Sequence, residues 1–153
     1  MDSAYILPFF KSIKNVFTTM LAMDVSPNAP TIQNTDFPPH NVSAIIGLSG
    51  DVTGSVVLSL PTSTAKDLVE AFLGPGMDFS QEDMADAIGE LVNMIAGGAK
   101  AEFHGKDVSI STPTIIMGMG HRVYGRRKNP IIEIICDCDK GDFVVHVLIE
   151  ESS

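Results

Sequence analysis

Apolar residues recur at intervals of three and four along three segments of the chain, which is the spacing of one face of an α-helix. The predicted helices are residues 3–23, a short helix capped by Thr62 or Ser63 and closed by Gly74, and a long helix from residue 81 to about residue 104. Ser80 and Asp83 have the spacing of a capping box, so the start of the long helix is well marked.

Runs of β-branched and other apolar residues predict strands around these helices. The predicted strands are residues 31–35, 42–48, 54–60, 108–114, 131–138 and 143–149, with 115–120 continuing or bending the fourth. Residues 49–53 join the second and third strands into a hairpin. The stretches 24–30 and 121–129, the second of which is basic, are predicted loops.

The long helix divides into two faces when its residues are set at about 100° each. One arc holds the apolar residues Met84, Ile88, Leu91, Val92, Ile95 and Ala99. The opposite side, here called the polar stripe, holds Asp86, Glu90, Asn93, Gly97 and Lys100. A buried face is therefore predicted to support an exposed polar one.

Glu90 and Asn93 are three residues apart, so their side chains point the same way with Cβ atoms about 5–6 Å apart. Most such pairs are simply solvated. Two features favour a functional pair: Asn is a poor helix former, and Gly89 and Gly97 flank the pair at a cost of roughly 0.5–1 kcal/mol each. Because glycine has no side chain, another macromolecule can approach the helix backbone closely at these positions. Gly98 lies nearer the buried face and is predicted to allow tight packing on a neighbour.

Composition limits the classes of function. The 153 residues are 44% hydrophobic, which suits the core of one domain, residues 1–153. The formal net charge of −9 argues against general binding to nucleic acid or an anionic membrane and suits a partner with basic groups. We see no signal-peptide pattern, and no apolar run approaches the roughly 20 residues of a membrane span. A cytoplasmic location is therefore expected.

The two cysteines lie on the next-to-last predicted strand. A turn at Lys140-Gly141 would place Cys138 opposite Phe143, with Cys136 on the same apolar side of the sheet. His146 falls on the other side, so too few ligands converge for a zinc site. Neighbouring same-face cysteines on one strand sit near the 7 Å limit for bridging. Both thiols are predicted to be buried and free, and no metal site is expected in the chain.

Together these residues resemble the CheC/CheX/FliY family of chemotaxis phosphatases, most closely its CheX members. The resemblance runs along nearly the whole chain, including residues 8–20, 46–58 and 89–97. The family motif is an Asp or Ser, three residues, Glu, two residues, Asn, and a Pro some twenty residues on; here it is met by Asp86, Glu90, Asn93 and Pro113. The implied fold is an α/β (α+β) domain with long helices packed on a mainly antiparallel sheet.

The resemblance implies hydrolysis of the aspartyl phosphate on a CheY-type chemotaxis response regulator. Asn93 would orient the attacking water, and Glu90 would pair with a lysine of the regulator. The residues expected to contact the regulator around them are Asp86, Gly89, Gly97, Lys100 and Pro113. Mg²⁺ would belong to the regulator, so no cofactor is expected in this chain.

The resemblance also implies one active site per chain and a homodimer. CheC carries the motif in each half, whereas the first helix here reads Ser12-Ile13-Lys14-Asn15, with no carboxylate where Glu would stand. CheX-like members form dimers through their sheets, and the half-apolar face around Ile135, Val144 and Leu148 is a candidate contact.

Two other functions stay open at this point. The same helix face could bind a response regulator or a flagellar component without accelerating hydrolysis. A sheet-lined pocket could instead bind a small ligand. Loss of turnover in Asn93→Ala with binding retained would identify catalysis, whereas a co-purified metabolite would support the ligand sensor.

Overall fold

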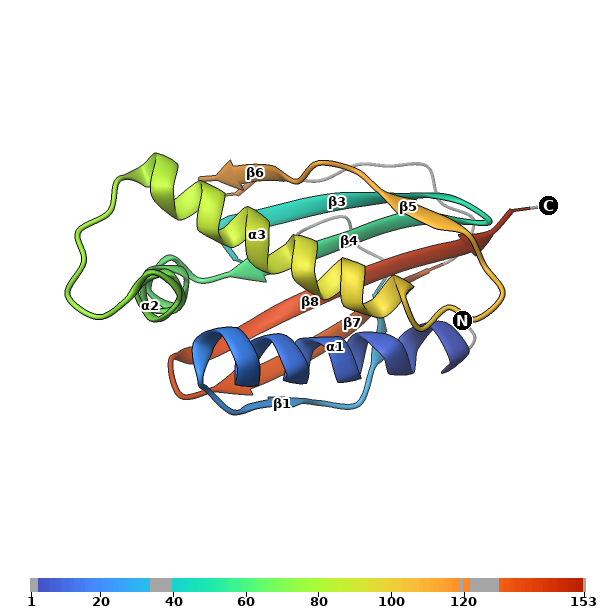
Figure 1. Cartoon of the computed structure of the whole chain (residues 1–153), viewed down its shortest axis with the longest axis horizontal. Coiled ribbons are helices and arrows are strands. Elements are labelled where there is room, and N and C mark those ends of the chain that lie inside the picture. Colours follow the sequence, from blue (N-terminus) through green and yellow to red (C-terminus); the bar gives the residue numbers. More distant parts are fainter. Residues whose placement is uncertain (1–2, 34–39, 119, 122–129, 153) are drawn as a thin grey trace.

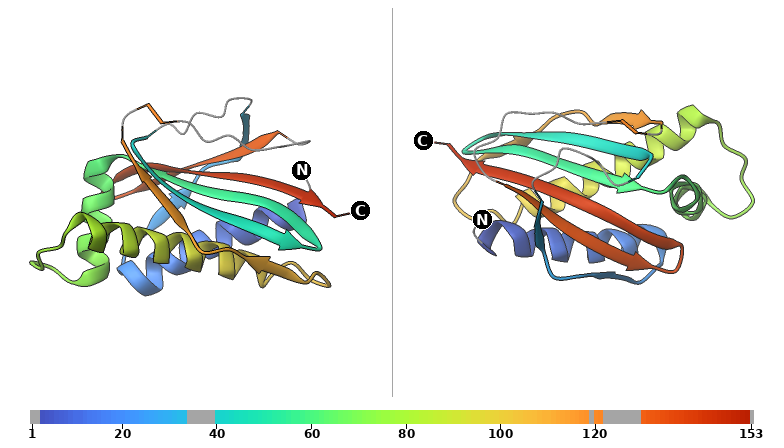
Figure 2. Two further views of the ribbon diagram at one scale, coloured as in Figure 1. Left: turned by 90° about the horizontal axis from the view of Figure 1, so that it is seen from above. Right: turned by 180° about the vertical axis from the view of Figure 1, so that it is seen from behind.

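The computed structural model of the chain describes residues 3–33, 40–118, 120–121 and 130–152. An antiparallel sheet forms one layer, and the long helices lie together across one of its faces (Figure 1 and Figure 2). Helices α1 (Ser3–Leu21) and α3 (Gln81–Lys100) lie side by side and run in opposite directions. Helix α2 (Thr62–Leu73) lies at the end where α3 begins. The predicted α+β class is confirmed.

Every pairing between neighbouring strands of the sheet is antiparallel. The strands are β1 (Val25–Pro27), β2 (Thr31–Gln33), β3 (Val42–Gly50), β4 (Val52–Leu60), β5 (Val108–Ile110), β6 (Thr114–Met117), β7 (Ile131–Cys138) and β8 (Gly141–Glu151). Their order is β1-β7-β8-β4-β3-β5, with β2 also on β7 and β6 also on β3. The predicted loop 24–30 therefore contains a short edge strand, β1, which the sequence did not reveal.

The predicted β3–β4 hairpin is present, with Leu48 opposite Gly54. The strands extend into the predicted connection 49–53, because β3 ends at Gly50 and β4 begins at Val52. The register predicted for the last hairpin is wrong by two residues. Phe143 lies opposite Cys136, and the two-residue turn is Asp139-Lys140. Gly141 belongs to β8, where a Cβ would come within 2.6 Å of Thr64 Oγ1. Thr64 Oγ1 donates to the Lys140 carbonyl at 3.0 Å, so α2 fixes this turn.

The segment after α3 forms two short strands, not the single strand predicted through Pro113. Leu48 pairs with Ile110 and Ile45 pairs with Thr114. Three residue steps along β3 therefore correspond to four along the segment that runs from β5 to β6. This extra residue has the two-against-one count of a β-bulge. Proline has no N–H to give to a ladder, which explains why β5 ends before it.

Three helix ends differ from prediction. Helix α1 ends at Leu21, two residues before the predicted end. Helix α3 ends at Lys100, four residues early, and the chain leaves it in a turn where the Phe103 N–H donates to the Lys100 carbonyl at 3.0 Å. Helix α2 has Pro61 at its N-cap with no side-chain cap bond, so neither Thr62 nor Ser63 caps it. The predicted capping box of α3 is present.

The core lies between the helices and the sheet. Every residue of the apolar arc predicted for α3 is buried. Cys136 is also buried, and burial raises the pKa of its thiol to about 12. Both cysteines are free, and Cys138 is half-buried. The prediction of free thiols is confirmed, with only one of them fully in the core.

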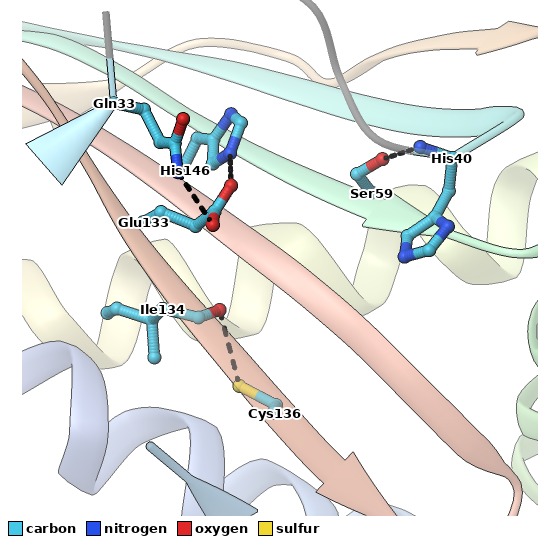
Figure 3. Close-up of polar contacts among 7 residues, drawn as sticks. All are labelled: Gln33, His40, Ser59, Glu133, Ile134, Cys136 and His146. Carbon is cyan, nitrogen blue, oxygen red and sulfur yellow. Dashed lines mark hydrogen bonds and ion pairs between the residues drawn. The ribbon is translucent and has the colours of Figure 1, made fainter. Parts of the chain in front are cut away.

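The opposite face of the sheet is polar where β7 meets β8 (Figure 3). Glu133 lies opposite His146, and its Oε2 is 2.8 Å from His146 Nε2. Gln33 Nε2 from β2 donates to Glu133 Oε1 at 3.0 Å, so the carboxylate ties two strands and the histidine together. The basic stretch 121–129 lies outside the described residues except for His121, whose Nε2 is 2.7 Å from Ser43 Oγ.

The candidate dimer contact on this face is smaller than expected. Ile135 is 38% exposed, but Val144 is only 5% exposed, and Leu148 is half-buried. Val144 therefore has little surface to offer a second copy, which corrects the prediction for that residue.

Candidate active site

The candidate site is the outward face of α3, and its position depends on how firmly the helix begins. Ser80 Oγ accepts from the Asp83 N–H at 3.0 Å, and Asp83 Oδ2 accepts from the Ser80 N–H at 3.1 Å. Both partners of the capping box are therefore satisfied, which fixes the first turn. Each later residue then has a set position around the helix axis.

The polar stripe faces away from the core as predicted. Asp86 and Glu90 are exposed, whereas Asn93 is half-buried. In the described part of the chain, no hydrogen bond or ion pair engages the side chains of these three residues. Their carboxylates and carboxamide are therefore available to a partner.

Pro113 lies against α3 beside this pair, although it is twenty residues away in sequence. A Cβ on Gly89 would come within 3.1 Å of Pro113 Cγ and 3.6 Å of Ile115 Cδ1. Gly89 is buried, so it is not open on the exposed face as predicted; its missing side chain makes room for Pro113. The fourth member of the motif thus borders the same stretch of helix as Glu90 and Asn93.

The bulge that carries Pro113 is held by a contact that the sequence did not reveal. The Gly47 N–H donates to Ser111 Oγ at 2.8 Å, and the Ser111 N–H donates to the Gly47 carbonyl at 2.9 Å. These two bonds between one residue of β3 and one residue of the bulge hold the segment that places Pro113 beside α3. A serine two residues before the motif proline is a weak signal on its own.

The other side of α3 packs on α1. A Cβ on Gly98 would run into Ser12 Oγ, and that hydroxyl donates to the Ile95 carbonyl at 2.7 Å. Gly98 therefore allows close helix packing, as predicted. Ser12, where the first helix lacks the motif carboxylate, is only 6% exposed and forms part of this contact.

Gly97 and Lys100, the last two members of the polar stripe, are less exposed than Asp86 and Glu90. Gly97 is half-buried, and a Cβ there would lie 3.9 Å from Ile110 Cδ1, an ordinary contact distance. Lys100 Nζ donates to the Val108 carbonyl at 2.8 Å and so ties the end of α3 to β5. The ammonium group keeps two further donors.

These features, a long amphipathic helix that turns a Glu-x-x-Asn pair away from the core of an antiparallel sheet, are those expected of a chemotaxis phosphatase of the CheC/CheX type. The model of the family described as "Chemotaxis phosphatase CheX" matches residues 42–137, and the chain belongs to that family.

Known relatives agree in sequence and in structure. The chain is 33% identical over 122 residues to the CheY-P phosphatase CheX of Thermotoga maritima, with 77% of this chain and 78% of the relative covered. It is 32% identical to the chemotaxis protein CheX of Desulfovibrio desulfuricans, whose crystal structure matches with a TM-score of 0.88 over 95% of this chain and 99% of that one. The expected resemblance is confirmed.

A third relative was crystallised with a partner. The CheX–CheY–BeF3–Mg²⁺ complex of Borrelia burgdorferi matches with a TM-score of 0.77 over 96% of this chain and 98% of that one. At 24% identity it supports the fold alone.

Two features are absent from the described residues. No helix there is long and apolar enough to cross a membrane. In the same part of the chain, no three or more His, Cys, Asp or Glu side chains are grouped to hold a metal ion.

Proposed function

We propose that this protein hydrolyses the aspartyl phosphate of a CheY-type response regulator, with Asn93 and Glu90 entering the regulator's site together. The observation that carries the proposal is the pair itself: two side chains one helical turn apart, facing outward, with no hydrogen-bond or ion-pair partner among the residues that the structure describes. Membership of a family of chemotaxis phosphatases and the name of the T. maritima relative support the same substrate.

Asn93 acts on the attacking water. An acyl phosphate is already reactive, so holding a water in line with the bond that breaks supplies much of the acceleration. The water oxygen bonds to phosphorus while the bond from phosphorus to the aspartyl oxygen breaks. The products are inorganic phosphate and the free carboxylate, and the water's proton passes to phosphate or solvent. A carboxamide suits this role because it can both donate and accept a hydrogen bond.

Glu90 fixes the orientation of the regulator. Its carboxylate accepts a charge-assisted hydrogen bond from a lysine ammonium group of the partner. Mg²⁺ is held by the regulator's own residues, so this chain contributes no metal ligand. Asp86, Gly97, Lys100 and Pro113 border the pair and contact the regulator around it.

Two further properties belong to the proposal. The protein acts in the cytoplasm, where response regulators are phosphorylated. It acts as a homodimer with one site in each copy, and the copies meet through the sheet, which leaves both α3 helices open to regulator.

The experiment is the decay of phosphorylated regulators of the same cell, with and without the protein. Wild type should accelerate phosphate release, Asn93→Ala should reduce that acceleration about 100-fold, and Glu90→Ala should raise KM about tenfold. Binding of regulator to Asn93→Ala should persist. A wild type that binds a regulator without accelerating its dephosphorylation would reject catalysis and leave a non-catalytic binding module.

A further inference from the structure

A hollow of about 350 Å³ opens where the end of α2 meets the start of α3, beside the polar stripe. It is called here the α2–α3 hollow. Its lining combines apolar side chains, here called the floor, with exposed carboxylates, here called the rim. The floor is Phe72, Leu73 and Met77, and the rim is Asp78, Asp83 and Asp86. Met77 is 56% exposed, so its side chain is accessible to a partner. Asp86 belongs both to this rim and to the polar stripe.

The hollow lies on one flank of α3 and Pro113 lies on the other. At about 100° per residue, Asp83 and Glu90 turn from Asp86 toward the α2 side, whereas Gly89 turns toward Pro113. Glu90 therefore stands between Asn93 and the hollow. At about 1.5 Å of rise per residue, Asp86 and Asp83 lie roughly 10 and 15 Å along the axis from Asn93.

This spacing means that one partner reaches both places. A specific interface of standard size covers about 800 Å² on each partner, a patch with a radius of about 16 Å. A regulator whose contact patch is centred on Asn93 would therefore also reach the Asp83 and Asp86 side of the α2–α3 hollow. What the hollow offers is an apolar floor with three carboxylates around it, on a chain of net charge −9.

We propose that the α2–α3 hollow is a second docking point for the response regulator, which receives an apolar side chain flanked by lysine or arginine. The apolar residue buries against Met77 and Leu73, and the basic neighbours pair with the rim carboxylates. This inference rests on the proposed function. In this inference the hollow determines which regulator binds. Asn93 and Glu90 cannot do so, because they contact groups that all phosphorylated regulators share.

The test measures the dissociation constant of the wild type and its variants for beryllofluoride-activated regulators of the CheY type from the same cell. Met77→Glu, which places a carboxylate on the apolar floor, should raise Kd about tenfold. Asp78→Lys should raise Kd about threefold at low salt, and this difference should shrink as salt is added. The control is Ile32→Glu, because Ile32 is 63% exposed on β2, at the sheet edge far from α3.

A Kd for Met77→Glu within twofold of wild type, or an equal loss in Ile32→Glu, would overturn the inference. Because binding is measured without turnover, the two proposals fail separately. A wild type that binds regulator through the hollow but does not accelerate hydrolysis would reject only the proposed function. Normal catalysis by wild type, with an unchanged Kd for Met77→Glu, would reject only the docking point.

Discussion

Helices α1 and α3 are alike in length and lie antiparallel on the same face of the sheet (Figure 1). Of the two, only α3 carries a Glu-x-x-Asn pair, Glu90 and Asn93. On α3, Glu90 is exposed and Asn93 is half-buried. The corresponding positions of the α1 motif hold Ser12 and Asn15. Asn15 is exposed, but Ser12 is buried and donates to the backbone of α3 at Ile95.

This difference shows that the orientation of a helix about its own axis, as well as its sequence, decides whether the helix can carry a site. The polar stripe of α3 faces solvent, and its flanks meet Pro113 on one side and α1 on the other. In α1 the position that would carry the carboxylate falls in the seam between the two helices. A serine fits there because its hydroxyl can bond to a helix carbonyl. The geometry supports one site per chain.

The largest expected effect comes from forcing the missing carboxylate into α1. Ser12→Glu should lower the free energy of unfolding by about 3–5 kcal/mol, because it buries an unpaired charge in the seam. Asn15→Glu, at an exposed position of the same helix, should change it by less than about 0.5 kcal/mol. Urea denaturation measures both. A well-folded Ser12→Glu with added phosphatase activity would show that α1 can be a second site.

The seam can also be tested from the α3 side with two adjacent glycines. Gly98→Ala should lower the free energy of unfolding by about 1–3 kcal/mol, because its Cβ meets Ser12. Gly97→Ala should raise it by roughly 0.5–1 kcal/mol through helix propensity, because its Cβ meets nothing closer than an ordinary contact.

Adding Ser12→Ala to Gly98→Ala should recover part of the lost stability, which a double-mutant cycle would measure. Equal effects of the two glycine substitutions would contradict the close packing of α1 on α3. Gly97→Ala should also weaken regulator binding, since the methyl group stands on the polar stripe.

The start of α3 is the next test. Ser80→Ala should cost about 1 kcal/mol of stability through loss of the cap. Thr62→Ala at the start of α2 should cost less than about 0.5 kcal/mol, because α2 has no side-chain cap bond. Thermal denaturation of the two variants compares them directly. An equal loss in both would mean that Thr62 is a cap, as the sequence had indicated.

The smallest effect concerns how the two helices end. Ala22 follows α1 with φ of 50°, a conformation that costs a residue with a Cβ more than glycine. Ala22→Gly should therefore raise the free energy of unfolding by about 0.5 kcal/mol. Ala101 caps α3 with a φ of −61°, so Ala101→Gly should not raise the free energy of unfolding. Stabilisation of Ala101→Gly in place of Ala22→Gly would contradict these backbone conformations.

The sequence predicted α3 well because its local signals agree with each other. Ser80 and Asp83 mark the start, and the period of the apolar residues separates the buried face from the polar stripe. The same is true of the β3–β4 hairpin, where two apolar runs flank a short turn. In these elements, residues that are close in sequence are also close in space.

The errors fall where distant segments decide the outcome. Moving a two-residue turn by one position shifts a hairpin register by two. In the observed register, Thr64 of α2 donates to the Lys140 carbonyl, a contact between segments far apart in the sequence. The burial of Gly89 depends on Pro113, which reaches α3 through a bulge bonded to Gly47. The α2–α3 hollow likewise combines residues from two helices and the loop between them.

The most direct test of the central claim compares the two helices in one assay. Phosphate release from a phosphorylated CheY-type regulator should be accelerated equally by wild type and Asn15→Ala, and about 100-fold less by Asn93→Ala, with the regulator's affinity retained. That result would place the site on α3 alone. Equal activity of Asn93→Ala and wild type, or a loss of turnover in Asn15→Ala, would contradict it.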